Sequence, residues 1–184
     1  MFVFLNYGGG FMEINILGKA ILGLYRYLEP MTLSIDKMIQ TRAFDYNCAI
    51  GYNVEDLSKE MISLTHRKVA IINLKVLIDK AISRLSSQNK RIIILKYIDN
   101  MSNKDITELM NISLRTFFRR LQRAFDSFCQ CLSFENSCND DILQNYLTQK
   151  WFRNFLDFFD DKKEKTEGSL VMCNHLFREV KQVY

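Results

Sequence analysis

Proline and glycine are scarce in this sequence, whose 184 residues include one proline and seven glycines. A strand-rich fold needs many tight turns, and these two residue types supply most of them. Leucine, isoleucine, lysine, arginine and glutamine, which tolerate helix interiors well, are frequent instead. We therefore expect an all-α fold.

Long apolar runs and paired metal ligands are also lacking. No apolar run approaches the roughly 20 residues of a membrane span, so we expect no membrane partner. The five cysteines are an odd number without paired C-x-x-C spacing. This favours reduced thiols in a cytoplasm, packed as small hydrophobic side chains, over a zinc site. We expect neither a metal nor any other cofactor.

The residues that catalysis would need are equally sparse. Only two histidines occur, His66 and His175, and neither has an evident nucleophile beside it. The carboxylate pairs at 140–141 and 160–161 are adjacent in sequence, so they do not face each other across a cleft. We expect that the protein is not an enzyme.

Composition shifts divide the chain into four expected segments. Residues 1–11 resemble an upstream extension, because three glycines precede Met12 as a translated ribosome-binding site would. Residues 12–84 are expected to form a helical hairpin, interrupted at Pro30, and residues 85–132 a compact helical unit. Residues 133–184 should hold C-terminal helices, with a charged linker over 160–169 and a last helix over 170–183.

The most regular pattern lies between residues 54 and 85. A heptad seam of apolar residues runs through Leu57, Leu64, Ile71, Ile78 and Leu85, and Asn53 is placed to cap this long helix. Its partner is either the segment 14–45 folded back on it or a second protomer. Lys68 and Lys75 interrupt the seam, which favours the intramolecular hairpin over a parallel homodimer.

Positive charge is concentrated just after this seam. Between Arg84 and Arg123 there are nine basic and three acidic residues, a net charge of +6, so the rest of the chain carries −2. A localised basic excess suggests a polyanionic partner, although a solvated helix face would look the same.

The same region has the pattern of three short helices. The first is expected over 89–98 and the second over 103–110, with Ile106 and Leu109 facing inward. Asn100 and Asn111 suit left-handed turn positions, while Ser102 and Ser113 suit helix N-caps. A third helix over 114–128, after a tight turn, gives helix-turn-helix architecture.

The third helix divides into two faces. Phe117, Leu121, Ala124 and Phe128 share the face that should pack inward. The opposite face could enter a DNA major groove, because arginine can read guanine and glutamine can read adenine. The residues expected to contact bases are Leu114, Arg115, Phe118, Arg119 and Gln122. Those expected at backbone phosphates are Lys104, Ser113, Thr116, Arg120 and Arg123.

These residues also match a known pattern. The run from Leu85 to Ala124 resembles region 4 of bacterial sigma-70-type transcription initiation factors, particularly the extracytoplasmic-function group. The resemblance rests on Asp105-Ile106 in register with a second set of matches: Ile112, Ser113, Thr116, Arg120, Leu121, Arg123 and Ala124. Departures include Ser86 for proline, Asn100 and Asn111 for glycine, and Phe117 for valine.

The resemblance implies a bacterial or phage transcription regulator that binds double-stranded DNA and recruits RNA polymerase through its β-subunit flap. Residues 12–84 do not resemble sigma region 2, so the layout is similar to small sigma-like regulators. Two alternatives stay open. One is a protein-interaction module that binds polymerase or a sigma factor without reading DNA, and the other is a phage assembly or packaging component.

An aromatic-rich stretch follows over residues 140–159. It includes Ile142, Tyr146, Trp151, Phe152, Phe155, Phe158 and Phe159. Such density could mark a partner surface or a base-stacking platform, but the helical spacing favours packing in the core.

Overall fold

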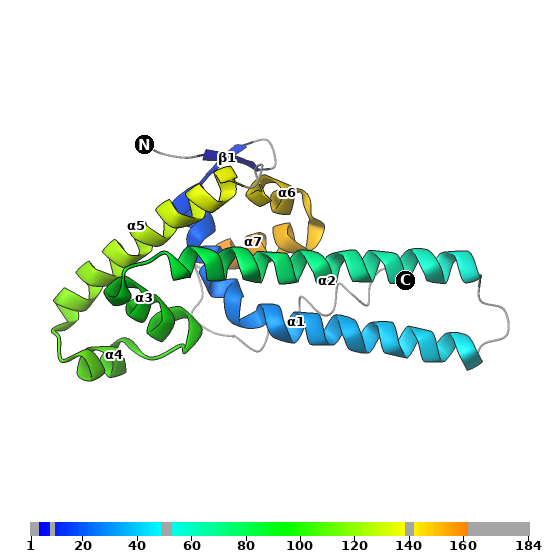
Figure 1. Cartoon of the computed structure of the whole chain (residues 1–184), viewed down its shortest axis with the longest axis horizontal. Coiled ribbons are helices and arrows are strands. Elements are labelled where there is room, and N and C mark those ends of the chain that lie inside the picture. The colour runs from blue at the N-terminus through cyan, green and yellow to red at the C-terminus, as the bar shows by residue number, and fades with distance from the viewer. Residues whose placement is uncertain (1–3, 8–9, 49–52, 139–141, 162–184) are drawn as a thin grey trace.

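A computed structural model describes residues 4–7, 10–48, 53–138 and 142–161. Its helices are α1 (Ile14–Cys48), α2 (Val54–Ser83), α3 (Ser87–Ile93), the π-helical turn η1 (Ile94–Ile98), α4 (Asn103–Met110), α5 (Leu114–Cys138), α6 (Ile142–Thr148) and α7 (Lys150–Asp161). The fold is all-α, as expected, and Figure 1 shows the order of its helices. Residues 160 and 161 of the expected linker belong to α7 instead, and the rest of that linker, 162–169, lies with the expected helix over 170–183 outside the described residues.

A short antiparallel hairpin precedes the helices. Strands β1 (Phe4–Tyr7) and β2 (Gly10–Glu13) pair in the register that places Phe4 opposite Glu13 and Leu5 opposite Met12. The hairpin thus includes residues on both sides of Met12, and the upstream extension expected over residues 1–11 stays a prediction.

Helix α1 runs through Pro30 without a break, so the predicted interruption there is wrong. Proline removes one backbone hydrogen bond and bends the helix. Figure 1 shows α1 changing direction between its blue N-terminal part and its cyan C-terminal part. Leu28 and Met31, on either side of the proline, are buried. Tertiary packing of these neighbours keeps the helix continuous.

Helices α1 and α2 pack side by side in opposite directions (Figure 1). The predicted cap is confirmed, since the Asn53 side chain accepts a hydrogen bond from the Glu55 amide at 3.0 Å. The seam residues Leu64, Ile71 and Ile78 are buried, as the heptad pattern predicts.

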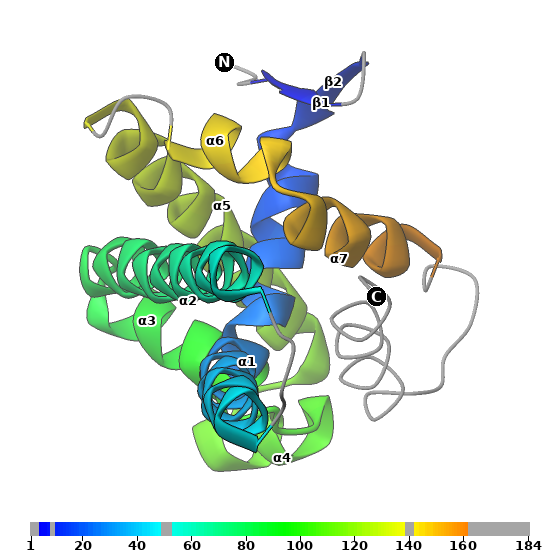
Figure 2. The same cartoon turned by 90° about the vertical axis from the view of Figure 1, so that its right-hand side faces the viewer.

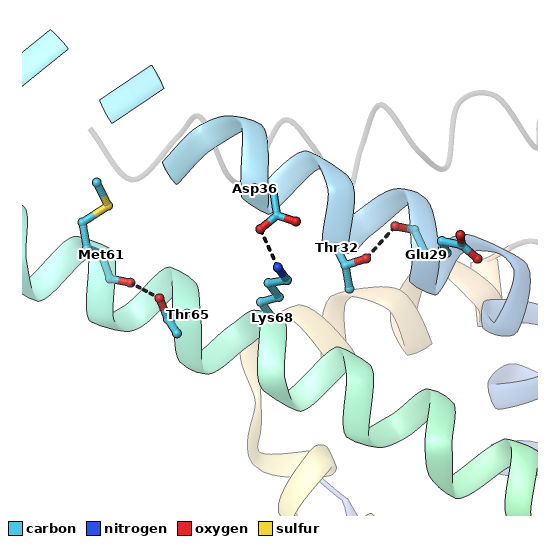
Figure 3. A network of polar contacts seen from close by, with 6 residues as sticks. All are labelled: Glu29, Thr32, Asp36, Met61, Thr65 and Lys68. Carbon is cyan, nitrogen blue, oxygen red and sulfur yellow. Dashed lines mark hydrogen bonds and ion pairs between the residues drawn. The ribbon is translucent and has the colours of Figure 1, made fainter. Parts of the chain in front are cut away.

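Four polar pairs cross the α1–α2 interface along its length. The Tyr25 hydroxyl donates to Asp79 Oδ1 at 2.6 Å. The remaining pairs join Lys75 to Glu29 at 3.2 Å, Lys68 to Asp36 at 2.6 Å, and Arg42 to Glu60 at 3.2 Å. Figure 3 shows the Asp36–Lys68 pair between the two helices. The two lysines that interrupt the seam are therefore matched by carboxylates of the same chain.

The core is one continuous cluster that includes side chains of α1, α2, α5, α6 and α7. Figure 2 shows the blue N-terminal part of α1 between α5 and α7. Helix α1 contacts both of these helices. Tyr146, Phe152 and Phe155 are buried, and the rings of Trp151 and Phe152 lie 5.5 Å apart. The interpretation of the aromatic stretch as core is confirmed for these residues; the side chains of Phe158 and Phe159 lie outside the described set.

Candidate DNA-binding site

The site begins with a helix whose end is widened. Ser86 caps α3, because its hydroxyl accepts from the Asn89 amide at 3.5 Å, and Ile92 and Ile93 are buried behind it. The backbone then forms η1, in which the Asp99 amide donates to the Ile94 carbonyl at 2.9 Å. The single regular helix expected over 89–98 is thus α3 followed by one π-helical turn. Such widened turns are frequent near functional sites.

The turn that follows has the predicted chemistry. Asn100 and Asn111 both adopt the left-handed conformation, with φ of 53° and 49°. Ser102 caps α4 by accepting a hydrogen bond from the Asp105 amide at 3.1 Å. The Lys96 ammonium donates to Asn103 Oδ1 at 2.7 Å, which ties η1 to the start of α4. Asparagine therefore fills positions where glycine would also fit.

One inward position of α4 was predicted wrongly. Ile106 is fully buried, as expected, but Leu109 is 53% exposed. Met110, one helical turn after Ile106, is half-buried against the core in its place. Residues four apart share a helix face, so this short helix presents Ile106 and Met110 to the core and turns Leu109 to solvent.

Helix α5 starts at the predicted residue and extends well past the predicted end. Ser113 accepts from the Thr116 amide at 3.3 Å and so caps it. The helix continues to Cys138, so the end predicted at residue 128 is wrong. Cys129 and Leu132 are buried along this extension.

Close packing holds α5 against α1. A side chain at Gly18 would place its Cβ 2.8 Å from Cys129 Sγ, so any other residue there would force the Cys129 side chain or the helices to shift. The Lys19 ammonium also lies 5.4 Å from the centre of the Phe125 ring. These contacts with α1 anchor α5 in the core, and the first half of α5 extends from this anchored part.

The inward face of α5 is the predicted one. Phe117, Ala124 and Phe128 are fully buried, and Leu121 is half-buried against the core. Phe125 also belongs to this face, although it was not predicted. Its place two turns after Phe117 in the helical repeat was the signal that could have found it.

None of the ten residues predicted to contact DNA is buried. Thr116 and Arg120 are half-buried and the others are exposed, including Lys104 in α4 and Ser113 before α5. Arg115, Arg119 and Gln122 follow one another on a single exposed face. With a rise of about 1.5 Å per residue, this face spans about 10 Å from Arg115 to Gln122, or about three base-pair steps.

Local contacts on this face leave its arginines available. The Gln122 amide donates to Asp126 Oδ1 at 2.8 Å, and Lys104 lies 3.9 Å from Glu108. Within the described part of the chain, Arg115, Arg119, Arg120 and Arg123 form no ion pair. Four cations against one carboxylate give the first half of α5 a positive face suited to a polyanion. Asp126 was not part of the predicted site.

The described residues include no group of three or more histidine, cysteine, aspartate or glutamate side chains arranged to hold a metal ion. Over those residues, no helix is both long and apolar enough to cross a bilayer.

A family model described as sigma-70, region 4 matches residues 75–127. This range begins inside α2 and ends within α5, so it contains α3, η1, α4 and the exposed basic face. No curated protein and no solved structure gives a significant match to the chain. Residues 75–127 are thus a sigma-70 region 4-like helix-turn-helix domain, as the sequence pattern predicts. Domains of this kind bind DNA and RNA polymerase.

Proposed function

Because the chain carries a sigma-70 region 4-like domain, we propose that it is a transcription regulator that recognises a specific DNA sequence by placing the first half of α5 in the major groove. The observation that carries this proposal is the exposed face of Arg115, Arg119 and Gln122 on a helix whose opposite face is buried. A B-DNA major groove is wide enough for one helix, and these side chains can form the bidentate contacts that distinguish bases.

The remaining predicted residues suit contacts with the backbone. Lys104 and Ser113 lie at the N-terminal ends of α4 and α5, where free amides and the helix dipole favour phosphate. Arg120 and Arg123 lie on the flanks of the groove-facing residues. Phosphate contacts of this kind fix the position of the helix, whereas the base contacts determine sequence.

Recruitment of RNA polymerase is a further part of the proposal. It is supported by the family match, since region 4 domains bind polymerase as well as DNA. A regulator of this kind would bind a promoter through α5 and present another surface of the domain to the enzyme.

The test is selection of bound duplexes from a randomised DNA pool by the full chain at one fixed, stated salt concentration. We expect a consensus to be enriched. Affinity for that consensus should then fall linearly with salt on logarithmic axes, with a slope of about 0.9 per phosphate contact. A folded protein that enriches no sequence would overturn the proposal.

A second candidate function is a protein-interaction module that binds polymerase without reading DNA. The observation that favours it is the exposure of Leu109, Leu114 and Phe118, which are 53%, 52% and 49% exposed in this domain. Binding to purified RNA polymerase that weakens little with salt, together with no enriched DNA sequence, would favour this candidate.

A further inference from the structure

Two large apolar side chains stand within the basic face of α5. Leu114 and Phe118, one helical turn apart, are 52% and 49% exposed. The Phe118 ring lies 5.4 Å from that of Phe117, which is fully buried. Phe118 is therefore held at the surface next to an anchored neighbour, and its free half points away from the core.

The neighbours of this apolar pair restrict what can cover it. Arg115, Arg119 and Gln122 share the same exposed face, and the two arginines form no ion pair within the described ranges. An apolar protein surface would cover Phe118 only by also desolvating these cations, which is costly. Duplex DNA satisfies both kinds of side chain, because its groove edges are rich in acceptors and its backbone is anionic.

In the major groove one group distinguishes a base by apolar contact, namely the C5-methyl group of thymine. Phe118 lies midway between Leu114 and Gln122, about 6 Å along the helix axis from each. A methyl group that meets Phe118 would thus belong to a base next to those that the arginines and Gln122 can reach.

We propose that Phe118, with Leu114 beside it, makes α5 selective for thymine at one or two positions of its target through contact with the C5-methyl group. The inference rests on the proposed DNA-binding function and deepens it, since it assigns a base preference to two residues that have no hydrogen-bonding side chain.

The experiment replaces each thymine of the selected duplex, one at a time, by deoxyuridine. This change keeps the base pair and removes only the methyl group. For the unaltered protein, we expect one or two positions at which the affinity falls about 3- to 10-fold, the factor that one buried methyl group gives. At the other thymines the affinity should not change.

Variants of the protein identify the side chain responsible. Phe118→Ala should bind the thymine and uracil duplexes equally at one or more of those positions, whereas Phe118→Leu, which stays apolar, should keep a preference for thymine there. Phe134→Ala is the matched control, because Phe134 is an equally exposed phenylalanine, at 52%, in the second half of α5. It should discriminate as the unaltered protein does.

The outcomes separate this inference from the proposed function. Enrichment of a consensus with no effect of uracil at any thymine would overturn the thymine contact and leave DNA recognition standing. A folded Phe118→Ala variant that keeps the full thymine preference would also overturn it. If Phe118→Ala kept its DNA affinity but no longer bound purified RNA polymerase, Phe118 would be assigned to a protein contact instead. Failure to enrich any sequence would overturn the proposed function, and the inference with it.

Discussion

The guanidinium Nε of Arg84 lies 2.7 Å from Oε1 of Glu135, a carboxylate whose side chain is only 4% exposed. Arg84 follows the last turn of α2, and Glu135 belongs to the second half of α5. The Arg84 guanidinium also lies 4.3 Å from the centre of the Phe134 ring. This contact joins the end of the long hairpin to the far end of the helix whose first half carries the proposed DNA-binding face.

Arg84→Met should lower the free energy of unfolding by about 1–3 kcal/mol, because it removes the arginine that pairs with a buried carboxylate. Urea denaturation measures this change. Arg91→Met, which removes an exposed arginine of α3, serves as the control and should have little effect. Adding Glu135→Met to Arg84→Met should recover stability, since replacing both partners by apolar groups is often nearly neutral. A double variant less stable than Arg84→Met would show that the ion pair with Arg84 is not what stabilises Glu135 at its buried position.

Ala124→Glu should strongly destabilise the domain. Ala124 is fully buried on the inward face of α5, so the substitution places an unpaired charge, and a larger side chain, at a helix contact. We expect a loss of more than about 3 kcal/mol, measured by thermal or urea unfolding. The neighbouring Arg123→Glu, on the exposed side, should change stability by no more than about 0.5 kcal/mol. An unchanged melting temperature for Ala124→Glu would contradict the assignment of the buried face.

Local rules predicted those parts of the fold that local interactions determine. The cap at Asn53, the left-handed turns at Asn100 and Asn111, and the burial of Ile71 in the heptad seam all follow from the chemistry of a few neighbouring residues. The start of α5 at Leu114 follows from Ser113 in the same way.

The incorrect predictions share one cause: at these positions tertiary contacts determine the structure, and local sequence rules do not include them. Proline inside a helix costs about 3 kcal/mol, but burial of Leu28 and Met31 offsets this by a similar amount. In the second half of α5, Glu135 occupies a buried position and so interrupts the apolar pattern of the sequence. Its burial is explained by the ion pair with Arg84, a contact that the sequence does not reveal. The predicted burial of Leu109 is wrong because the contacts of α4 with its neighbours determine whether Leu109 or Met110 faces the core.

Lys68→Glu should destabilise the α1–α2 hairpin. It replaces an ion pair with Asp36 by two facing carboxylates, and both partners are about one-third exposed. The expected loss is therefore modest, about 1 kcal/mol, and it should shrink as salt is added. Asp36→Lys in the same chain should restore stability by reversing the pair. A loss that Asp36→Lys does not rescue would contradict the pairing within one chain.

Stability should fall at alkaline pH because the fold raises the pKa of two tyrosines, the buried Tyr146 and the half-buried Tyr25. Burial raises the pKa of Tyr146 to about 12, and burial together with the hydrogen bond to Asp79 raises the pKa of Tyr25 to about 12. Both hydroxyls should thus favour the folded state fully below pH 10, and this contribution is lost as the pH rises from about 10 to about 12. Urea unfolding at pH 8 and at about pH 11 measures the loss.

Tyr146→Phe separates the contribution of one of these tyrosines. It removes the hydrogen bond from the Tyr146 hydroxyl to the Ala70 carbonyl, 2.9 Å long, and so should cost about 1 kcal/mol near neutral pH. The stability of this variant should decrease less between pH 8 and about pH 11 than that of the unaltered protein. An equal decrease in both proteins would show that Tyr146 does not contribute to the pH dependence.

Arg119→Ala should weaken binding to the selected duplex by about 1–3 kcal/mol if Arg119 contacts a base. Its exposed position between Arg115 and Gln122, with no ion pair among the described residues, is the reason to expect a base contact. Fluorescence anisotropy with the selected duplex and with a scrambled duplex, at one salt concentration, measures both affinities. Lys59→Ala, which removes one positive charge from the exposed side of α2, should alter neither. Equal losses on the two duplexes would instead place Arg119 at a phosphate, because a backbone contact carries no direct sequence information.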